Sequence, residues 1–452
     1  MGRSSCSPLT FLITGFSWLL LSSLMGLAIL IGLVNGTPLP SWLRLVHVHG
    51  LLIGGILQLM IGGLLASGSL NGQSDRTPSG SHLWLFVTLN AATVGLLVGF
   101  GFGNMLIVGA AGIVVIGSVI LIAKRAWQYK PQSLPQSADP SWLYRFSLIA
   151  LLGGLLVGVA MAFRLMPEYS AHARLFHLHA ILLGFITMTM IGATHHFLPI
   201  ILNTTLYSQR LAKFVMGLLP TGFIILIGGF ITSSLYLELA IGGLLILGII
   251  LYAYNLFRTW AASGHPGNAA SDHLFVATFF LVLMMVMGVL VGANFLPQPP
   301  ALPFGSLQRA AYTHMALIGF ILQTVFGALS YGIPEMLVIS RVSSKKKQGP
   351  YRDQLIAIID RWRAIQLIGL SLGTMGFGLL AVMTWNVPLG SLSLQIATWV
   401  TVGLLLSGLT LFSAKLSSVL GIRPLNSLAS SVAPEETFHQ PLKRAVGETH
   451  RF

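Results

Sequence analysis

Long apolar stretches separated by short polar segments dominate the chain from residue 11 to residue 418. Each stretch has about 20 residues or more, the length that an α-helix needs to cross the hydrocarbon core of a bilayer. We count twelve such stretches, and the boundary between the third and the fourth, at Gly103-Asn104, is the least marked. The expected spans are 11–34, 46–68, 83–103, 105–125, 144–165, 177–199, 212–231, 236–258, 272–293, 309–334, 364–386 and 394–418.

The composition supports an all-α, polytopic membrane protein. Of the 452 residues, 54% are hydrophobic and only 8% are charged, which is too few charges for a soluble protein of this size. The first stretch has no convincing small-residue cleavage site, so we expect it to remain as a membrane helix. The only cysteine is Cys6, which excludes an internal disulfide, a cysteine-rich zinc site, an iron–sulfur cluster and a dicopper thiolate site.

The net charge of +14 is explained by membrane topology and does not indicate nucleic-acid binding. With twelve spans, four arginines fall in one set of loops, and the other 21 basic residues fall at the termini and in the alternate loops. Because basic residues stay on the cytoplasmic side, we expect both termini to be cytoplasmic, in a bacterial-type inner membrane. The segment 341–363 is then the longest cytoplasmic loop, and 422–452 is a basic tail that we expect to be disordered.

Three of the four outer arginines begin the same pattern, R-x-x-[H/Y]-x-H-x-x-x-x-G, which we call the signature. The three copies read RLVHVHGLLIG from Arg44, RLFHLHAILLG from Arg174 and RAAYTHMALIG from Arg309, spaced 130 and 135 residues apart. A second glycine follows eight residues after the first in each copy. Twelve helices and three copies predict three pseudo-symmetric four-helix repeats, about 1–130, 131–262 and 263–421, within one membrane domain.

Each signature opens the second helix of its repeat, at the outer end. Six aligned positions therefore hold five histidines and one tyrosine at similar depth: His47, His49, His177, His179, Tyr312 and His314. Residues i and i+2 lie roughly 200° apart around an α-helix, so the two positions of one signature serve two different pockets. In a ring of three repeats, each pocket then receives one residue from each of two helices.

The sequence allows two arrangements of these pockets, which differ in handedness. The first pairs His47 with His314, His49 with His177, and His179 with Tyr312. The second pairs His314 with His177, His47 with His179, and His49 with Tyr312. Either arrangement gives two bis-histidine pockets and one histidine–tyrosine pocket.

A bis-histidine pocket among apolar helices is typical of a low-spin b-type haem, whose iron binds an imidazole on each face. The signature arginines Arg44, Arg174 and Arg309 suit the haem propionates as charge-assisted donors, although interfacial arginines also occur without a ligand. Zinc favours three or four ligands, more than one pocket offers. We therefore expect one or two b-type haems; a single haem would leave His49 and His177 as remnants of the duplication.

These residues resemble the catalytic subunit of the haem–copper oxidases, closest to the C-type cytochrome c oxidases and the nitric oxide reductases. The resemblance extends over most of the chain but is strong only in the three signature helices. It is carried by HAILLGFITMTMIGATHHFLP, by YTHMALIGFILQTVFGALSYGIP and by the spacing from His47 to Gly62. It implies that His47 and His314 bind the low-spin haem, which selects the first arrangement. It also implies that His179 stands at a copper ligand and Tyr312 at the active-site haem ligand.

The chain departs from that family at the binuclear centre. Tyr312 stands where the family has a histidine, and the helix 212–231, which carries two further copper ligands in the family, has no histidine. A complete copper site is therefore not expected. His195 and His196 lie roughly 24 Å along the helix from His179, and we expect them to be polar residues at the inner water interface, with a second metal or haem there as the lesser alternative.

The sequence thus predicts a haem-binding electron-transfer protein that contacts lipid and a redox partner, either a partner subunit or cytochrome c, with quinol as a possible substrate. If the chain is an enzyme, it is a subunit of a respiratory oxidase or a nitric oxide reductase-like complex. Two alternatives stay open. One is a protein that binds or reduces nitric oxide or oxygen at a five-coordinate haem near Tyr312 and His179. The other is a haem or copper transporter.

Overall fold

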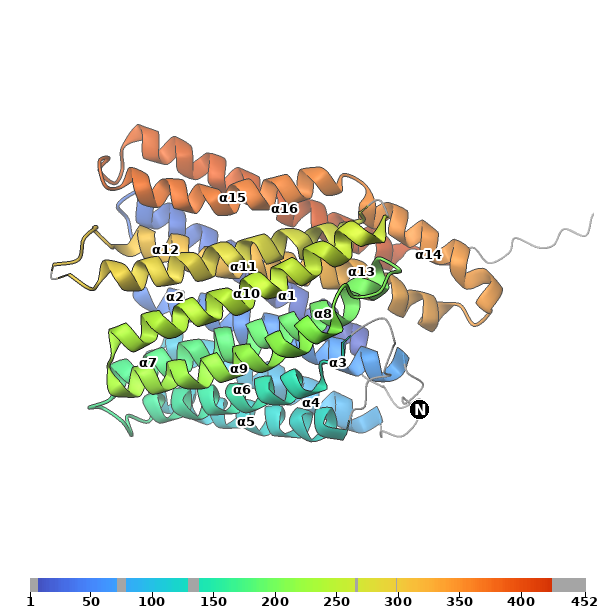
Figure 1. Cartoon of the computed structure of the whole chain (residues 1–452), viewed down its shortest axis with the longest axis horizontal. Helices are drawn as coiled ribbons and strands as arrows, with labels where there is room; N and C mark the ends of the chain where they lie inside the picture. Colours follow the sequence, from blue (N-terminus) through green and yellow to red (C-terminus); the bar gives the residue numbers. More distant parts are fainter. Residues whose placement is uncertain (1–6, 71–78, 129–137, 265–266, 298, 425–452) are drawn as a thin grey trace, which may run out of the picture.

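The computed structural model describes residues 7–70, 79–128, 138–264, 267–297 and 299–424, and these residues form helices and no strand. Twelve helical segments are long and apolar enough to cross a membrane, so the predicted multi-pass, all-α class is confirmed. The boundary at Gly103-Asn104 also separates two helices as predicted. Figure 1 shows the long helices running side by side along the longest axis of the molecule.

The elements follow one another without intervening strands. In chain order they are α1 (Pro8–Val34), α2 (Ser41–His49), η1 (Gly50–Leu57), α3 (Gln58–Leu70), α4 (Ser79–Gly101), α5 (Met105–Gln128), α6 (Ser141–Ala162), α7 (Ser170–His179), η3 (Ala180–Thr187), α8 (Met188–Ile201), α9 (Gln209–Thr232), α10 (Leu235–Ser263), α11 (Ala269–Asn294), α12 (Ser306–His314), η4 (Met315–Leu322), α13 (Gln323–Arg341), α14 (Lys345–Asp360), α15 (Arg363–Met383) and α16 (Leu392–Gly421).

Three of the membrane segments are composite, and these three carry the signatures. In each, a short α-helix ends at the second signature position, an eight-residue π-helix follows directly, and a second α-helix completes the span. The sequence analysis did not predict these π-helical segments. Because a π-helix has wider turns than an α-helix, it changes the direction in which later side chains point, and such segments are frequent at functional sites.

The first glycine of each signature lies inside the π-helical segment, at a close contact with a neighbouring helix. The glycines are Gly54, Gly184 and Gly319. A Cβ atom at these positions would lie 2.7, 2.7 and 2.5 Å from Trp18 of α1, Ala150 of α6 and Phe280 of α11, respectively. Real side chains do not approach this closely, so glycine is needed for the helices to pack. The repeated glycine therefore has a packing role.

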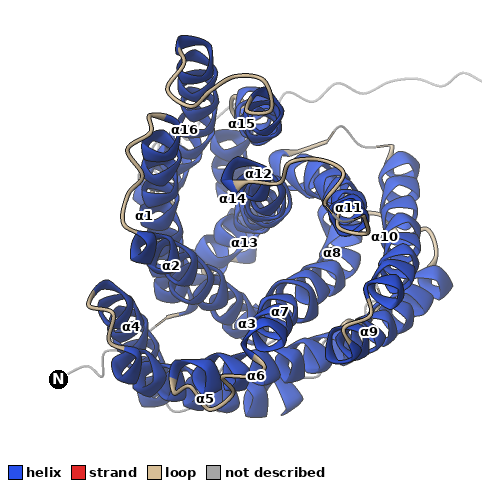
Figure 2. Ribbon diagram, turned by 90° about the vertical axis from the view of Figure 1, so that its left-hand side faces the viewer, coloured by secondary structure: helices blue, strands red, loops and turns tan. Residues whose placement is uncertain are grey.

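Seen along their axes, the helices lie in arcs, with α4, α5, α6, α9 and α10 along one side and α16, α1 and α2 along another (Figure 2). The pairs α4–α5, α9–α10 and α15–α16 pack along their lengths, and α5 contacts α6, α10 contacts α11, and α16 returns to contact α1. The signature segments pack against α1, α6 and α11, the helices that precede them. We call the end of the bundle that holds Arg44, Arg174 and Arg309 the signature end.

The segment 341–363 differs from the predicted loop because most of it is helical. Its helix α14 lies at the end of the bundle opposite the signature end (Figure 1). Arg352 of α14 forms an ion pair with Glu335 of α13, with a distance of 2.6 Å between Nε and Oε1. Hydrogen bonding to Glu335 raises the pKa of Arg352. Residues 425–452, most of the tail predicted to be disordered, lie outside the described residues.

Candidate functional site

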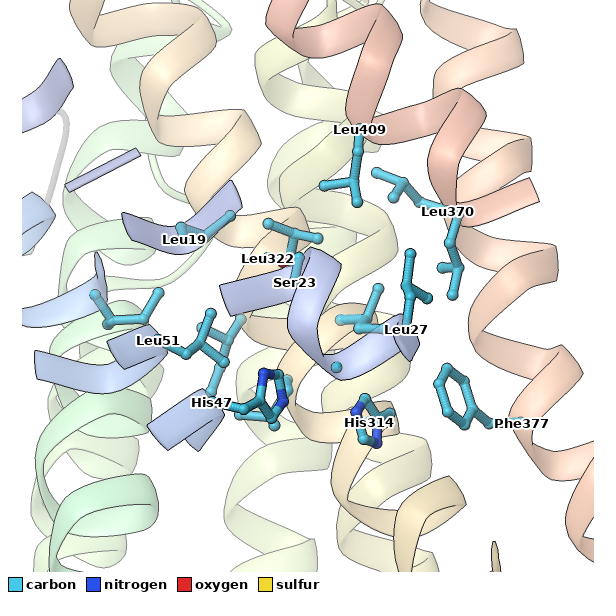
Figure 3. Close-up of a pocket in the computed structure, with 16 residues that line it drawn as sticks. Leu19, Ser23, Leu27, His47, Leu51, His314, Leu322, Leu370, Phe377 and Leu409 are labelled. Carbon is cyan, nitrogen blue, oxygen red and sulfur yellow. The ribbon is translucent and has the colours of Figure 1, made fainter. Parts of the chain in front are cut away.

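Two histidines from different signatures face each other between α2 and α12. The imidazole rings of His47 and His314 are nearly parallel, with an interplanar angle of 10° and 6.3 Å between ring centroids. Both line the same apolar cavity. Figure 3 shows the two rings side by side, with Leu19, Leu322 and other leucines gathered on one side of them. The first signature pair is therefore next to apolar space.

A second pair joins the other position of α2 to α7. The rings of His49 and His177 are 6.5 Å apart between centroids, with an interplanar angle of 21°. The edge of this pair is covered by Phe100, whose ring centroid lies 4.6 Å from that of His49. Both ring pairs are those of the first of the two arrangements that the sequence allows.

The third pocket of that arrangement differs from the other two. His179 and Tyr312 are not in ring contact in the described part of the chain. His179 instead packs on Phe230, with 4.7 Å between ring centroids. The Tyr312 hydroxyl lies beside Gly288 of α11. The predicted third pair is thus not brought together as a pair of stacked rings.

The Nδ1 atom of every signature histidine lies within hydrogen-bond distance of a backbone carbonyl oxygen. His47 and His177, at first positions, contact Ser22 O at 2.6 Å and Gly154 O at 2.7 Å on the preceding membrane helix. The second-position histidines contact the carbonyl four residues earlier in their own helix, at 2.9 Å for His49, 2.8 Å for His179 and 2.7 Å for His314.

A carbonyl oxygen can only accept a hydrogen bond, so each Nδ1 must carry the proton and donate it. In the neutral imidazole, Nε2 then has a free lone pair. This is the tautomer that metal-ligating histidines adopt, with the other ring nitrogen held by a carbonyl in the outer shell. All five signature histidines are therefore in the tautomer whose Nε2 lone pair can bind a metal.

The Nε2 atom of His47 is buried and has no hydrogen-bond partner. Leaving such a nitrogen unpaired costs about 1–3 kcal/mol, so its burial calls for an explanation. His47 is only 6% exposed, and the cavity beside it is lined mainly by aliphatic side chains that offer no donor. A metal bound at this nitrogen would satisfy it.

The ring separations can be compared with those of a metal bridge. Two metal–nitrogen bonds of about 2 Å and ~1 Å from each nitrogen to its ring centre place two bridged imidazoles roughly 6 Å apart. The centroid distances of 6.3 and 6.5 Å match this value. Direct stacking contact would bring the rings closer, as between His314 and Phe377, whose centroids are 4.4 Å apart. Both pairs therefore have the spacing of two axial ligands.

Three glycines on the helices that precede the signatures make room for the first-position side chains. A Cβ atom at Gly26 of α1 would lie 2.6 Å from Cε1 of His47, and one at Gly158 of α6 would lie 2.8 Å from Cε1 of His177. The corresponding glycine on α11, Gly288, would meet the Tyr312 hydroxyl at 2.8 Å. The sequence analysis missed these glycines, since no local pattern marks them.

The remaining predicted residues are less closely associated with the pockets. Arg44, Arg174 and Arg309 are exposed at the signature end. Within the described residues, no group of three or more His, Cys, Asp or Glu side chains is suited to hold a metal ion, so any metal here depends on the pairs.

His195 corrects one prediction. It was expected at the inner water interface, but it is fully buried, with its ring 5.0 Å from that of Tyr252 between centroids. Its neighbour His196 is partly buried. The α8 helix turns His195 toward α10 and away from water, which the spacing along the chain could not indicate.

Searches with family models and among curated proteins found no match to this chain.

Proposed function

We propose that the protein binds two b-type haems between its signature histidines and transfers electrons within the membrane. The observation that carries this proposal is the pair of bis-histidine contacts, each with metal-bridging spacing, Nδ1 anchored to a carbonyl and Nε2 left to bind. His47 and His314 would hold one haem, and His49 and His177 the other. Two imidazoles on one iron give a six-coordinate, low-spin centre that carries one electron.

The surroundings of His47 and His314 fit a porphyrin. The cavity beside them is apolar, and leucines from α1, α15 and α16 line it. Phe377 stacks on His314 with an interplanar angle of 7° and so fixes the orientation of that ring. The exposed arginines at the signature end could donate to haem propionates.

The chain's own residues favour electron transfer over chemistry on a bound substrate. Each pair would supply two imidazoles to one haem iron, which would leave no position for a substrate, and the cavity beside His47 and His314 is lined mainly by leucines and isoleucines. His47 and His49 are two residues apart on α2, so the two pockets are adjacent at the same depth. Electrons would therefore pass laterally between them, from a quinol or a redox partner subunit to an acceptor such as cytochrome c.

The proposal includes a divergent relationship to the haem–copper oxidases. Three repeated units are supported by the π-helical segment in each signature helix and by the glycine beside each first-position side chain, namely Gly26, Gly158 and Gly288. We also propose a bacterial-type inner membrane with both termini in the cytoplasm, because the basic residues of α14 lie opposite the signature end.

Optical spectra of the purified protein test the electron-transfer assignment. We expect a reduced-minus-oxidised difference spectrum with sharp low-spin b-type bands that carbon monoxide does not change, since both axial positions are occupied. A band that carbon monoxide shifts would instead assign a five-coordinate haem. Absence of any haem band would favour a transporter.

A further inference from the structure

A second cluster of polar side chains lies buried in the half of the bundle away from the signature end. His273 of α11, Gln323 of α13 and Gln366 of α15 are fully buried, and Lys415 of α16 is 5% exposed. Buried lysines in membrane segments are rare because of the cost of their charge, and they mark functional sites. The Lys415 ammonium has no carboxylate within ion-pair distance in the described part of the chain.

The four side chains form one chain of hydrogen bonds with a single direction. Lys415 Nζ donates to Gln366 Oε1 at 2.8 Å, and Gln366 Nε2 donates to His273 Nε2 at 2.9 Å. His273 Nδ1 donates to Gln323 Oε1. In this arrangement His273 is neutral, because its Nε2 accepts a hydrogen bond, and Lys415 can carry a proton while it donates to the amide oxygen.

The amide of Gln366 limits how many protons this cluster can hold. An amide offers one accepting oxygen and one donating nitrogen, so it can face only one protonated group with its oxygen. If the amide rotates, its oxygen can accept from a protonated His273 while its nitrogen donates to a neutral Lys415 amine. If Lys415 and His273 were both protonated, one of them would point an N–H group at the NH2 group of the Gln366 amide. Two donors cannot form a hydrogen bond with each other, so this state is disfavoured.

We infer that Lys415, Gln366 and His273 form a proton-binding site that holds one proton, carried either by the amine or by the imidazole according to the orientation of the amide. No bond other than an N–H bond forms or breaks in the exchange. The proton that leaves one nitrogen is bound by the other, and the total charge of the site is unchanged.

A group of paired charges lies at the α14 end of the bundle, near the start of α11. At the α14 end, Arg363 pairs with Asp272 at 3.1 Å and lies 4.0 Å from Asp360. Asp360 also accepts from Ala269 N at 2.6 Å.

The other ionisable groups on the surrounding helices form contacts with residues outside the Lys415–His273 site. On the far side of α11, His195 and Tyr252 pack on each other, and on α13 and α14 the Glu335–Arg352 pair is neutral as a whole. Arg341 of α13 donates to backbone carbonyls at the end of α16 and contacts the Tyr351 hydroxyl. The described residues of α1 include no ionisable side chain.

Substitutions of Lys415 test the inference, with 15N resonances of the histidine rings read in nanodiscs across a pH series. In Lys415→Met the amide can turn its oxygen to His273, and we expect His273 to bind a proton at least about tenfold more tightly than in the wild type. In Lys415→Arg, which keeps a permanent charge, His273 should stay neutral throughout. Lys124→Met, a substitution on the remote helix α5, should leave His273 as in the wild type.

Unchanged titration of His273 in both Lys415 variants would overturn the inference. The double variant Lys415→Met/Gln366→Leu separates the amide from simple charge removal, because without the amide the increase in proton affinity should be smaller. An equal increase in the double variant would also contradict the shared site. The ring resonance of His195, which packs on Tyr252, reports in each sample whether the fold is intact. Neither this reading nor the titration of His273 requires bound haem.

Discussion

His47 at the signature end and the buried His273 differ in how many of their ring nitrogens have hydrogen-bond partners. This difference distinguishes a histidine that can bind a metal from one that only forms hydrogen bonds. In His273 both ring nitrogens have side-chain partners, Gln323 on Nδ1 and Gln366 on Nε2. In His47 only Nδ1 is bonded, and Nε2 is buried without a partner. Burial of an imidazole is therefore not by itself a sign of metal binding. The sign is the pattern of one anchored nitrogen and one free nitrogen, in a ring whose centre lies at metal-bridging distance from that of a second imidazole.

The largest effect on haem content is expected from removing the imidazole of His47 or of His314, which line the cavity. His47→Ala or His314→Ala should lower the haem content of the purified protein by one haem per chain, because a single axial imidazole cannot maintain the six-coordinate site. The pyridine haemochrome assay measures this content. If both variants kept the full haem content, the assignment of this pair would be wrong.

Removal of the second pair tests whether both pockets are filled. His49→Ala and His177→Ala should each remove the other haem and leave the His47–His314 haem in place, so that the two sets of variants give complementary spectra. Equal haem contents in wild type and His177→Ala would reduce the number of haems to one.

The glycines beside the first-position histidines offer a milder perturbation. Gly26→Ala would place a methyl group 2.6 Å from the His47 ring, so the ring must turn, and we expect roughly tenfold weaker haem retention during titration with a haem-binding competitor. Gly117→Ala on α5 is the matched control, because nothing lies within 4 Å of a Cβ there. Equal retention in the two variants would show that the ring position does not matter.

A smaller change is expected from Phe377, which orients His314 without binding anything. Phe377→Leu removes the stacked ring and should keep the haem content while broadening the low-spin electron paramagnetic resonance signal of that haem, as the imidazole plane becomes less fixed. A loss of haem comparable to that of His314→Ala would give Phe377 a larger role than stacking.

The smallest effect is expected at histidines outside the two pairs. His179 packs on Phe230, and His273 has both nitrogens bonded, so His179→Ala and His273→Asn should keep the wild-type haem content. Loss of a haem in His179→Ala would instead show that His179 helps to hold a haem, and it would favour the gas-binding alternative near Tyr312.

Much of the fold could be predicted because it depends on local features. The length of each apolar stretch gave the twelve spans, and the repeated spacing of His47, His177 and Tyr312 brought six positions to the same depth. The choice between the two pairings could not be made from periodicity alone, because it depends on how the helices follow one another around the bundle. The resemblance to an oxidase family suggested the pairing that is observed in the two ring pairs.

Other features depend on contacts between distant segments and left no local signal. Gly26 looks like any other glycine in an apolar helix until the His47 ring lies against it. His195 was predicted at the water interface but is buried, because the helix turns it toward Tyr252. The cluster of His273, Gln366 and Lys415 joins residues up to 142 positions apart in the chain, so no spacing rule could find it.

The haem-to-protein ratio of the purified wild-type chain tests the central claim most directly. Two histidine pairs with free Nε2 atoms predict two b-type haems per chain, both low-spin in the oxidised state. A ratio near zero after expression with adequate haem supply would contradict the claim and leave the spacing of the four imidazoles without its proposed explanation.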